Sequence, residues 1–573
     1  MKNKELAGLF SRMADILEFK NENPFKISAY RKASRIIGDL TQDIEEIAEG
    51  GKLKEVPGIG EGMAQKIVEY LKIGKVSKFE EVRKGISDEL IAIMDIPGMG
   101  PKTLAMIHKE KGISSLSQLE KAVEDGSLVG LPGIGEKKVE NIKRGIQLLK
   151  QSKGRMNLGI AFPIAKQIVE TLREKAGSRK IEWAGSLRRM RENIGDIDIL
   201  ATGPNKEKIV HTFAHLPEVK EVLASGETKA SVIVEGGIQI DLRVVEEDSY
   251  GAALQYFTGS KDHNIHLRGI AKTKGIKINE YGVFKDEKKI GGKEEEDVYR
   301  ALGMDWIEPE LREDRGEIEA AKEARLPKLV KEVEIRGDLH VHSNWSDGTS
   351  SIEEIARAAQ KRGYQYVAIC DHSKSLKIAH GLDESRLMKQ IEEIDRINEK
   401  MKGFQILKGT EVDILTDGKL DLSEGVLKKL DLVVAAVHSG FKQEKEKMTK
   451  RIVRALENPL VHILAHPSGR LLGARDPYEV EIDEVMEAAK RYGKALEINA
   501  YFERLDLDDI HCRKAKEVGI RVAIGTDAHY LDQMWMISLG IAVARRGWLE
   551  SKDVLNTLTL KEILKGNWGR VHI

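Results

Sequence analysis

The spacing of apolar residues along the chain changes twice, and each change predicts a different architecture. Residues 1 to about 150 carry apolar side chains at helical spacing in short segments, which predicts short helices. Residues 151 to about 250 alternate strand-like and helix-like segments. From Arg336 onward, short apolar runs alternate with amphipathic segments, a pattern typical of an α/β barrel. The runs are Tyr366–Cys370, Gln405–Thr410, Leu432–Ala436, Val461–Leu464, Ala495–Ile498 and Val522–Ile524.

A tight turn that leads into a helix recurs three times in the N-terminal part, at Val56–Gly60, Ile96–Gly100 and Leu131–Gly135. Glycines at such turns let backbone N–H groups and the helix N-terminus approach a phosphate without reading the base. One such turn could be a plain helix start, whereas three favour helix-hairpin-helix elements that bind DNA non-specifically. The candidate DNA contacts are Gly58, Gly60, Gly98, Gly100, Gly133 and Gly135.

Paired carboxylates follow a glycine–serine pair in the segment Trp183–Leu200. Asp196 and Asp198 alternate with isoleucines, so on a strand both would share one face. Asp241 is a third acid, inside another alternating segment. Carboxylates on rigid strands suit Mg²⁺, and three of them suit a two-metal phosphoryl transfer. A single D-x-D pair is common on exposed strands, but Gly185-Ser186 followed by this acid pattern is the signature of the nucleotidyltransferase superfamily.

Imidazoles and carboxylates gather just past the predicted strand ends of the C-terminal part, where barrel active sites lie. His340 and His342 would share one strand face. Without a thiolate, the set suits Mn²⁺, Zn²⁺ or Fe²⁺ rather than a structural zinc. The nine candidate ligands are His340, His342, Asp347, His372, Glu411, His438, His466, Asp527 and His529.

Length and composition limit the classes of protein. With 573 residues, we expect three or more domains. Lys+Arg and Asp+Glu are equal at 93 each, so nucleic acid would be held by local patches. Two cysteines, no signal peptide and no membrane-length apolar run favour a cytoplasmic protein without a membrane partner.

Taken together, residues 1 to about 315 resemble a family X DNA polymerase, and residues 336–573 resemble a PHP (polymerase and histidinol phosphatase) domain. The resemblance implies a multidomain fold of α+β and α/β type, with a nucleotidyltransferase palm, a thumb and a distorted (β/α)7 PHP barrel. The expected domains are 1–88, lyase-like with a helix-hairpin-helix; 89–150, fingers-like with two helix-hairpin-helix elements; 151–250, palm; 251–315, thumb; 316–335, linker; and 336–573, PHP.

The resemblance also assigns roles in the polymerase. Gly185, Ser186 and Arg189 would bind the phosphates of the incoming nucleotide, and the three acids would be catalytic. Tyr256, Phe257 and Gly259 fall in the turn that contacts the sugar, Asn264 would face the minor-groove edge of the base, and Arg268 would contact the template. The segment 279–282 matches a motif that helps to set the closed state. Two departures are Lys261, at a position that is often acidic, and Gln239, where an arginine is common.

In the N-terminal domain, Lys66 falls where the family's Schiff-base lysine lies. Lys26, Tyr30 and Lys54 fall where the 5′-phosphate is bound, but Gly62 replaces one of the usual phosphate-binding lysines. A lysine on a helix is solvated by default, and desolvation would be needed to make it nucleophilic.

In the PHP domain, the resemblance divides the ligands among three ions. His340, His342, Glu411 and Asp527 would hold one ion. Glu411 would bridge to a second, held with His438 and His466. Asp347, His372 and His529 would hold the third.

The expected protein is a monomeric gap-filling repair polymerase that uses Mg²⁺, deoxynucleoside triphosphates and gapped or primed duplex DNA. Its PHP domain would degrade or process 3′ ends with Mn²⁺ or Zn²⁺. Lyase activity on 5′-deoxyribose phosphate, or cleavage at abasic sites, would be additional. One alternative is a PHP domain that hydrolyses pyrophosphate or other small phosphates. Another is a DNA-binding scaffold.

Overall fold

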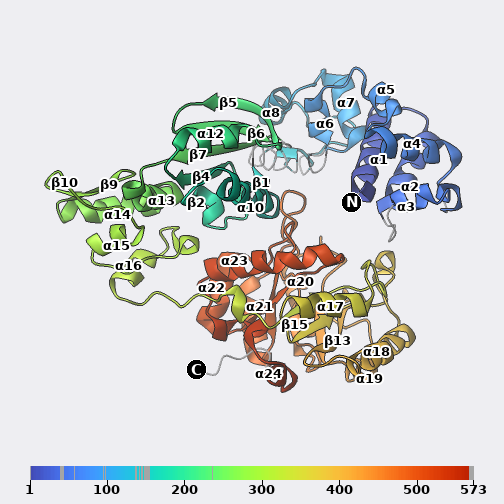
Figure 1. The fold of residues 1–573 in the computed structure, drawn as a ribbon. Helices are drawn as coiled ribbons and strands as arrows, with labels where there is room; N and C mark the ends of the chain where they lie inside the picture. The colour runs from blue at the N-terminus through green and yellow to red at the C-terminus, as the bar shows by residue number, and fades with distance from the viewer. Residues whose placement is uncertain are drawn as a thin grey trace. The chain divides into compact units, whose positions relative to one another are not determined.

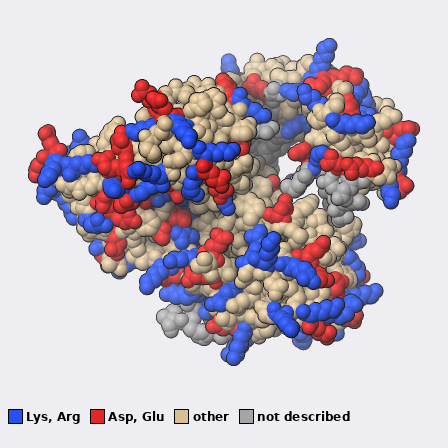
Figure 2. Space-filling model, in the orientation of Figure 1, with Lys and Arg blue, Asp and Glu red and all other residues tan. Residues whose placement is uncertain are grey.

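The computed structural model describes residues 2–566 except 39–43, 57–58, 95, 97–98, 136–137, 141, 144–145, 147–154 and 235–236. The chain forms two compact units, Met1–Lys153 and Gly154–Ile573. Within the described ranges, none of the helices is long and apolar enough to cross a membrane. Lysines and arginines are interspersed with acids on the visible face (Figure 2), as the equal numbers of the two charges lead one to expect.

The first unit is helical (Figure 1). Its elements are α1 (Lys2–Phe19), α2 (Pro24–Gly38), α3 (Ile44–Glu49), η1 (Leu53–Glu55), α4 (Glu61–Ile73), α5 (Ser77–Arg83), α6 (Asp88–Met94), α7 (Pro101–Lys111) and α8 (Leu116–Glu124). The apolar stripe of α1, including Leu6, Phe10 and Leu17, is buried in the common core, as amphipathic spacing predicts.

Two of the glycine turns lead into helices as the sequence predicts. Gly60 precedes α4 and Gly100 precedes α7, and Pro101 occupies the first turn of α7, where its missing N–H costs nothing. Gly133 has a left-handed φ of +74° in the third turn. Gly58 and Gly98 lie outside the described residues.

The second unit begins with the expected palm. Its elements are β1 (Met156–Asn157), α10 (Leu158–Lys175), β2 (Lys180–Trp183), α11 (Gly185–Arg188), β3 (Asn193–Ile194), β4 (Ile197–Thr202), α12 (Lys206–Ala214), β5 (Val219–Ser225), β6 (Lys229–Val234) and β7 (Ile238–Val244). The main sheet has the order β2-β4-β7-β6-β5, with β4 and β7 parallel. Ile197 and Ile199 of β4 are buried, so the acids between and beside them face away from the core.

The thumb region follows. Its elements are η2 (Glu247–Ser249), α13 (Tyr250–Thr258), α14 (Lys261–Thr273), β8 (Ile276–Asn279), β9 (Gly282–Lys285), β10 (Lys288–Gly291), α15 (Glu296–Ala301), η3 (Pro309–Leu311) and α16 (Glu317–Lys322). The segment expected to be a linker contributes to this core, because Ile318, Ala321 and Leu329 are buried in the same apolar cluster as Leu267 and Val298.

The remainder is a ring of seven parallel strands covered by helices, which confirms the predicted barrel. Its elements are η4 (Glu332–Glu334), β11 (Gly337–Val341), α17 (Ile352–Lys361), β12 (Tyr366–Ile369), η5 (Lys377–Ala379), α18 (Glu384–Asn398), β13 (Gln405–Asp413), α19 (Glu424–Leu427), β14 (Leu432–Ala436), α20 (Lys445–Glu457), β15 (Ile463–Leu464), α21 (Ile482–Tyr492), β16 (Ala495–Asn499), α22 (Asp509–Val518), β17 (Val522–Gly525), η6 (Leu531–Met536), α23 (Ile537–Arg546), η7 (Ser551–Asp553), η8 (Leu555–Thr557) and α24 (Leu560–Leu564).

The strands of the barrel are neighbours in chain order from β11 to β17. The ring is almost closed, since Val341 at the end of β11 forms a parallel bridge with Ala528 just after β17. In addition, the Asp527 N–H donates to the His340 carbonyl at 2.9 Å. All strand C-termini therefore meet at one end of the barrel.

Candidate active sites

The palm acids converge as the sequence predicts. Asp198 of β4 is directly opposite Asp241 of β7 in the parallel register, and Asp196 immediately precedes β4. Gly185 packs against this group with a left-handed φ of +60°, and a Cβ there would lie 2.6 Å from the Asp198 carboxylate. Only glycine fits that position, because both the backbone conformation and the space exclude a side chain.

The electrostatics of the palm acids favour a bound cation. Burial, reinforced by the charges of Asp196 and Asp241, raises the pKa of Asp198 to about 6. A divalent ion would relieve this repulsion, and carboxylate oxygens are the ligands that Mg²⁺ prefers. Asp241 is held by the Ser231 hydroxyl and by the Gln239 amide, which donates at 3.0 Å. Gln239, the departure noted in the sequence, thus positions the third acid.

The two arginines after Gly185-Ser186 are already paired within the protein. Arg188 donates to Glu295 through both terminal nitrogens, at 2.7 and 2.9 Å. Arg189 donates to the Thr258 carbonyl and, through Nε, to Glu313 at 3.1 Å. Arg189 would have to exchange these partners to bind a nucleotide phosphate.

The residues expected to contact the sugar and base lie around the end of α13. Tyr256 and Phe257 meet edge to face, with ring centroids 5.2 Å apart. A Cβ at Gly259 would lie 3.1 Å from the Arg189 guanidinium, so a larger residue would crowd that arginine. Asn264 is buried and bonds to Gln255 and to the Tyr256 carbonyl, whereas Arg268 is exposed on α14. Asn264 therefore holds the turn in this conformation.

Two of the candidate lyase residues, Lys66 and Tyr30, lie near each other in the first unit. Lys66 donates to the Gly62 carbonyl at 2.8 Å, and its nitrogen lies 5.9 Å from the centroid of the buried Tyr30 ring. Partial burial lowers the pKa of Lys66, which favours a nucleophilic amine. Lys54 pairs with Glu61 at 2.8 Å, and Lys26 pairs with Glu22 at 3.3 Å. Both ion pairs are exposed to solvent, so either lysine can exchange its carboxylate for a phosphate.

The nine candidate ligands of the PHP domain all lie at the C-terminal end of the barrel, near the ends of six strands. The structure forms three groups of side chains close enough to share ions: His342, Asp347, His372 and His529; His340, His342 and Asp527; and His372, Glu411 and His438. His466 also reaches this site, with Nε2 at 2.9 Å from Glu411. As expected, Asp347, His372 and His529 lie in one group, and His340, His342 and Asp527 lie in another. The groups differ from the expected division in three respects: Glu411 is not in the group of His340, His466 is in none of the three, and His342 and His372 each lie in two.

The donors fit divalent metal ions. Nε2 of His340 and Nε2 of His342 face each other at 3.1 Å, an arrangement that a shared cation would stabilise. Nδ1 of His342 and Nδ1 of His466 are buried without a hydrogen-bond partner, although buried polar atoms are normally satisfied. The carboxylates Glu411 and Asp527 are nearly inaccessible, and the surrounding histidines hold both of their pKa values low despite burial.

Sequence reasoning missed two residues at this site. Glu497 of β16 lies 2.6 Å from Nδ1 of His340, so it orients that ring with Nε2 toward the cluster, as carboxylates do for metal-binding histidines. Arg504, in the loop after β16, lies 3.6 Å from Asp527 and has a buried terminal nitrogen without a hydrogen-bond partner. The polar alternation in Ala495–Asn499 could have identified Glu497, but Arg504 has no such signal.

Comparison with known families assigns most of the chain. Residues 1–76 match a helix-hairpin-helix domain and residues 88–147 a SAM-like helix-hairpin-helix tandem. Residues 253–313 match the DNA polymerase beta thumb, and residues 338–501 the PHP domain. With the palm acids, these matches define the class: a DNA polymerase of the nucleotidyltransferase type joined to a PHP domain.

One relative covers almost the whole chain. The chain is 40% identical to the DNA polymerase/3′-5′ exonuclease PolX of Bacillus subtilis (strain 168) over 570 residues, which are 98% of this chain and 99% of the relative. It therefore belongs to the family X DNA polymerases that carry a C-terminal PHP domain. The PHP part alone resembles probable phosphatases. It is 35% identical to one from Thermoanaerobacter sp. (strain X514), over 40% of the chain and 94% of the relative. It is 36% identical to another from Caldanaerobacter subterraneus subsp. tengcongensis, over 38% of the chain and 86% of that relative.

Proposed function

We infer that this protein fills short gaps in DNA and removes nucleotides from 3′ ends, with one site for each reaction. The main observation in favour of the polymerase activity is that Asp198 and Asp241 lie opposite each other on neighbouring parallel strands, with Asp196 beside them. The full-length similarity to a DNA polymerase/3′-5′ exonuclease supports both activities.

In the polymerase, Asp196, Asp198 and Asp241 would hold Mg²⁺, which stabilises the charge of the transferring phosphoryl group. Gly185 and Ser186 bring backbone and hydroxyl close to the triphosphate, and Arg189 adds a cationic fork. Tyr256 and Phe257 pack against the deoxyribose. Arg268, exposed on α14, would contact the template strand, and the glycine turns of the first unit would hold the DNA backbone.

In the nuclease, the nine ligands of the barrel would hold up to three Mn²⁺ or Zn²⁺ ions, which act as Lewis acids on a phosphodiester. Glu497 keeps His340 oriented. Arg504 would bind the scissile phosphate, because a guanidinium with an unpartnered nitrogen beside the ligands is suited to a phosphate oxygen.

The polymerase is tested by Asp198→Ala. Nucleotide addition to a one-nucleotide gap should fall by orders of magnitude while DNA binding persists, because a metal ligand is lost. Retention of more than about a tenth of the wild-type rate would show that Asp198 is not such a ligand. Assays across Mg²⁺, Mn²⁺ and Zn²⁺, with a 3′-labelled strand, would identify the ions for each site.

A second function for the barrel is suggested by its similarity to probable phosphatases. The PHP site would then release orthophosphate from pyrophosphate or another small phosphate. Measuring nucleoside monophosphate from the labelled strand and orthophosphate from pyrophosphate on the same preparation separates the two functions. Lyase chemistry at Lys66 is a further proposal, supported by the lowered pKa of its amine.

A further inference from the structure

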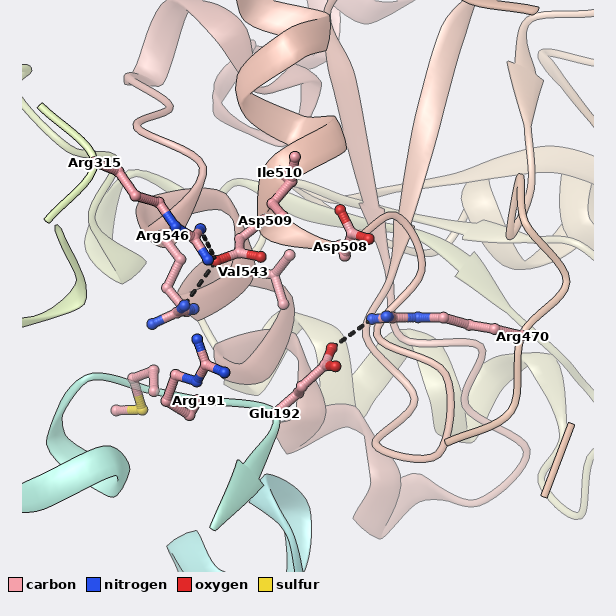
Figure 3. A pocket seen from close by; sticks show the side chains of 10 residues that line it. Arg191, Glu192, Arg315, Arg470, Asp508, Asp509, Ile510, Val543 and Arg546 are labelled. Carbon is pink, nitrogen blue, oxygen red and sulfur yellow. Dashed lines mark hydrogen bonds and ion pairs between the residues drawn. The ribbon is translucent and has the colours of Figure 1, made fainter. Parts of the chain in front are cut away.

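Within the second unit, the barrel and the polymerase part share a network of ion pairs. Arg545 and Arg546 end helix α23 of the barrel. Arg545 bonds to Glu310 at 2.7 Å and to Glu308 at 3.1 Å, whereas Arg546 reaches the loop after the Gly185-Ser186 motif. A cavity of about 160 Å³ lies beside this contact. Figure 3 shows Arg546 and Arg315 pointing to the same carboxylate, Asp509.

Arg546 is linked to Arg189 by a direct hydrogen bond and by a carboxylate, Glu313, that both arginines share. Its Nη1 donates to the Arg189 backbone carbonyl at 2.6 Å and to Oε1 of Glu313 at 3.0 Å. The same Oε1 accepts from Nε of Arg189 at 3.1 Å. The second terminal nitrogen of Arg546 donates to Asp509 at 2.7 Å, which holds the guanidinium in place from the barrel side.

Glu313 is therefore a buried carboxylate shared by two arginines. Its side chain is 11% exposed, that of Arg189 is 13% exposed and that of Arg546 is 5% exposed. Burial alone would raise the pKa of Glu313, but the nearby arginines, Arg189 foremost, hold it below its ordinary value. The carboxylate is thus charged, and leaving a buried charge without a partner is costly.

The shared carboxylate affects how Arg189 can bind a nucleotide. Arg189 must leave Glu313 to bind a phosphate, and the carboxylate then needs another cation. Arg191 approaches the other oxygen only to 3.6 Å and is 38% exposed, so it is a weak substitute. Arg546 already occupies Oε1 and remains when Arg189 departs.

We propose that Arg546 of the PHP domain is a positioning residue of the polymerase: it neutralises Glu313 and fixes the backbone of Arg189, which frees the Arg189 side chain for the triphosphate. The proposal rests on the proposed role of Arg189 as a phosphate ligand. Without Arg546, Glu313 would retain Arg189, and the nucleotide would have to compete with a buried ion pair.

The test is steady-state gap filling by full-length variants. Arg546→Ala should raise KM for the nucleotide about tenfold, with kcat within about threefold, while 3′→5′ degradation stays within about twofold. Arg546→Lys should recover part of the loss, since an ammonium can also pair with Glu313. The double variant Arg546→Ala, Glu313→Gln should restore KM, because a neutral amide does not retain Arg189.

The matched control is Arg545→Ala, which removes a neighbouring arginine of the same helix that also crosses to the polymerase part but does not contact Glu313. An equal rise of KM in this variant would mean that any weakening of the contact between the barrel and the polymerase part raises KM, and it would overturn the proposal. The proposal would also be overturned if KM did not rise in Arg546→Ala, or if Glu313→Gln did not restore it. Arg189→Ala distinguishes failure of the phosphate role of Arg189 from failure of its coupling to Arg546. If it leaves KM unchanged, the phosphate role of Arg189 fails; if it raises KM and Arg546→Ala does not, only the coupling fails.

Discussion

The substitution His342→Ala tests whether nucleotide removal depends on the barrel cluster and is independent of the palm. His342 belongs to two of the three ligand groups, so its loss leaves one with two ligands and the other with three. Burial and the neighbouring His529 and His372 lower the pKa of His342 to about 3, so the imidazole is neutral and the substitution removes a ligand without changing the charge. We expect 3′→5′ degradation to fall by about a thousandfold or more, roughly 4 kcal/mol in the activation free energy.

Primer extension should change little in the same variant. The side chain of His342 makes its polar contacts with other residues of the cluster. The arginines that join the barrel to the polymerase part bond instead to Glu310 and Glu313. We therefore expect extension within about threefold of wild type, roughly 0.6 kcal/mol.

Extension and degradation would be timed on one labelled gapped duplex, with a melting curve for each preparation. His380→Asn is the matched control, since His380 is an exposed barrel histidine outside the ligand groups, and asparagine tolerates its left-handed φ of +54°. A folded His342→Ala protein that loses both activities would refute the independence of the two sites. One that still degrades 3′ ends would move the nuclease away from this cluster.

Three other predictions concern separate parts of the chain. Lys66→Ala should abolish any borohydride-trapped adduct with a 5′-deoxyribose-phosphate end and leave gap filling largely intact; an adduct that persists would exclude Lys66. Arg504→Ala should lower kcat/KM for degradation by about tenfold to a hundredfold with extension unchanged, and normal degradation would remove Arg504 from the phosphate site. Glu295→Gln should destabilise the protein by about 3 kcal/mol at pH 7, because Arg312 and Arg188 hold the pKa of Glu295 at about 2 despite burial. Since this pKa in the folded protein lies below the ordinary 4.5, the stabilisation is complete above about pH 4.5 and disappears as the pH falls towards 2. The difference in Tm between wild type and variant should therefore shrink between these pH values. A difference that stays constant would contradict the ion-pair origin of the stabilisation.

The barrel was predictable because its strands are buried on both faces and appear as short apolar runs. The predicted runs match β12 to β17 within a few residues. The largest difference is β13, which continues to Asp413 because Glu411 and the following residues keep their register with β14. Ligands placed just after such runs must converge, since parallel strands end on the same side.

The contacts between distant segments could not be predicted. Glu313 and Arg546 are separated by 233 residues, and no periodic pattern connects them. The same holds for Arg189, whose position after Gly185-Ser186 suggested a phosphate ligand but gave no sign that a buried carboxylate holds it. Arg504 lies in an irregular loop, where side-chain direction depends on the fold rather than on local sequence.

The closure of the barrel has a consequence for biosynthesis. Because β17 completes the ring beside β11, Asp527 and His529 reach the cluster only after the chain has been synthesised through β17 and this strand has left the ribosome. The palm acids at 196, 198 and 241 are translated some three hundred residues earlier. A nascent chain therefore contains every palm carboxylate long before it can assemble a complete set of barrel ligands. A message truncated shortly before codon 527 would encode the palm acids but not the last two ligands of the barrel.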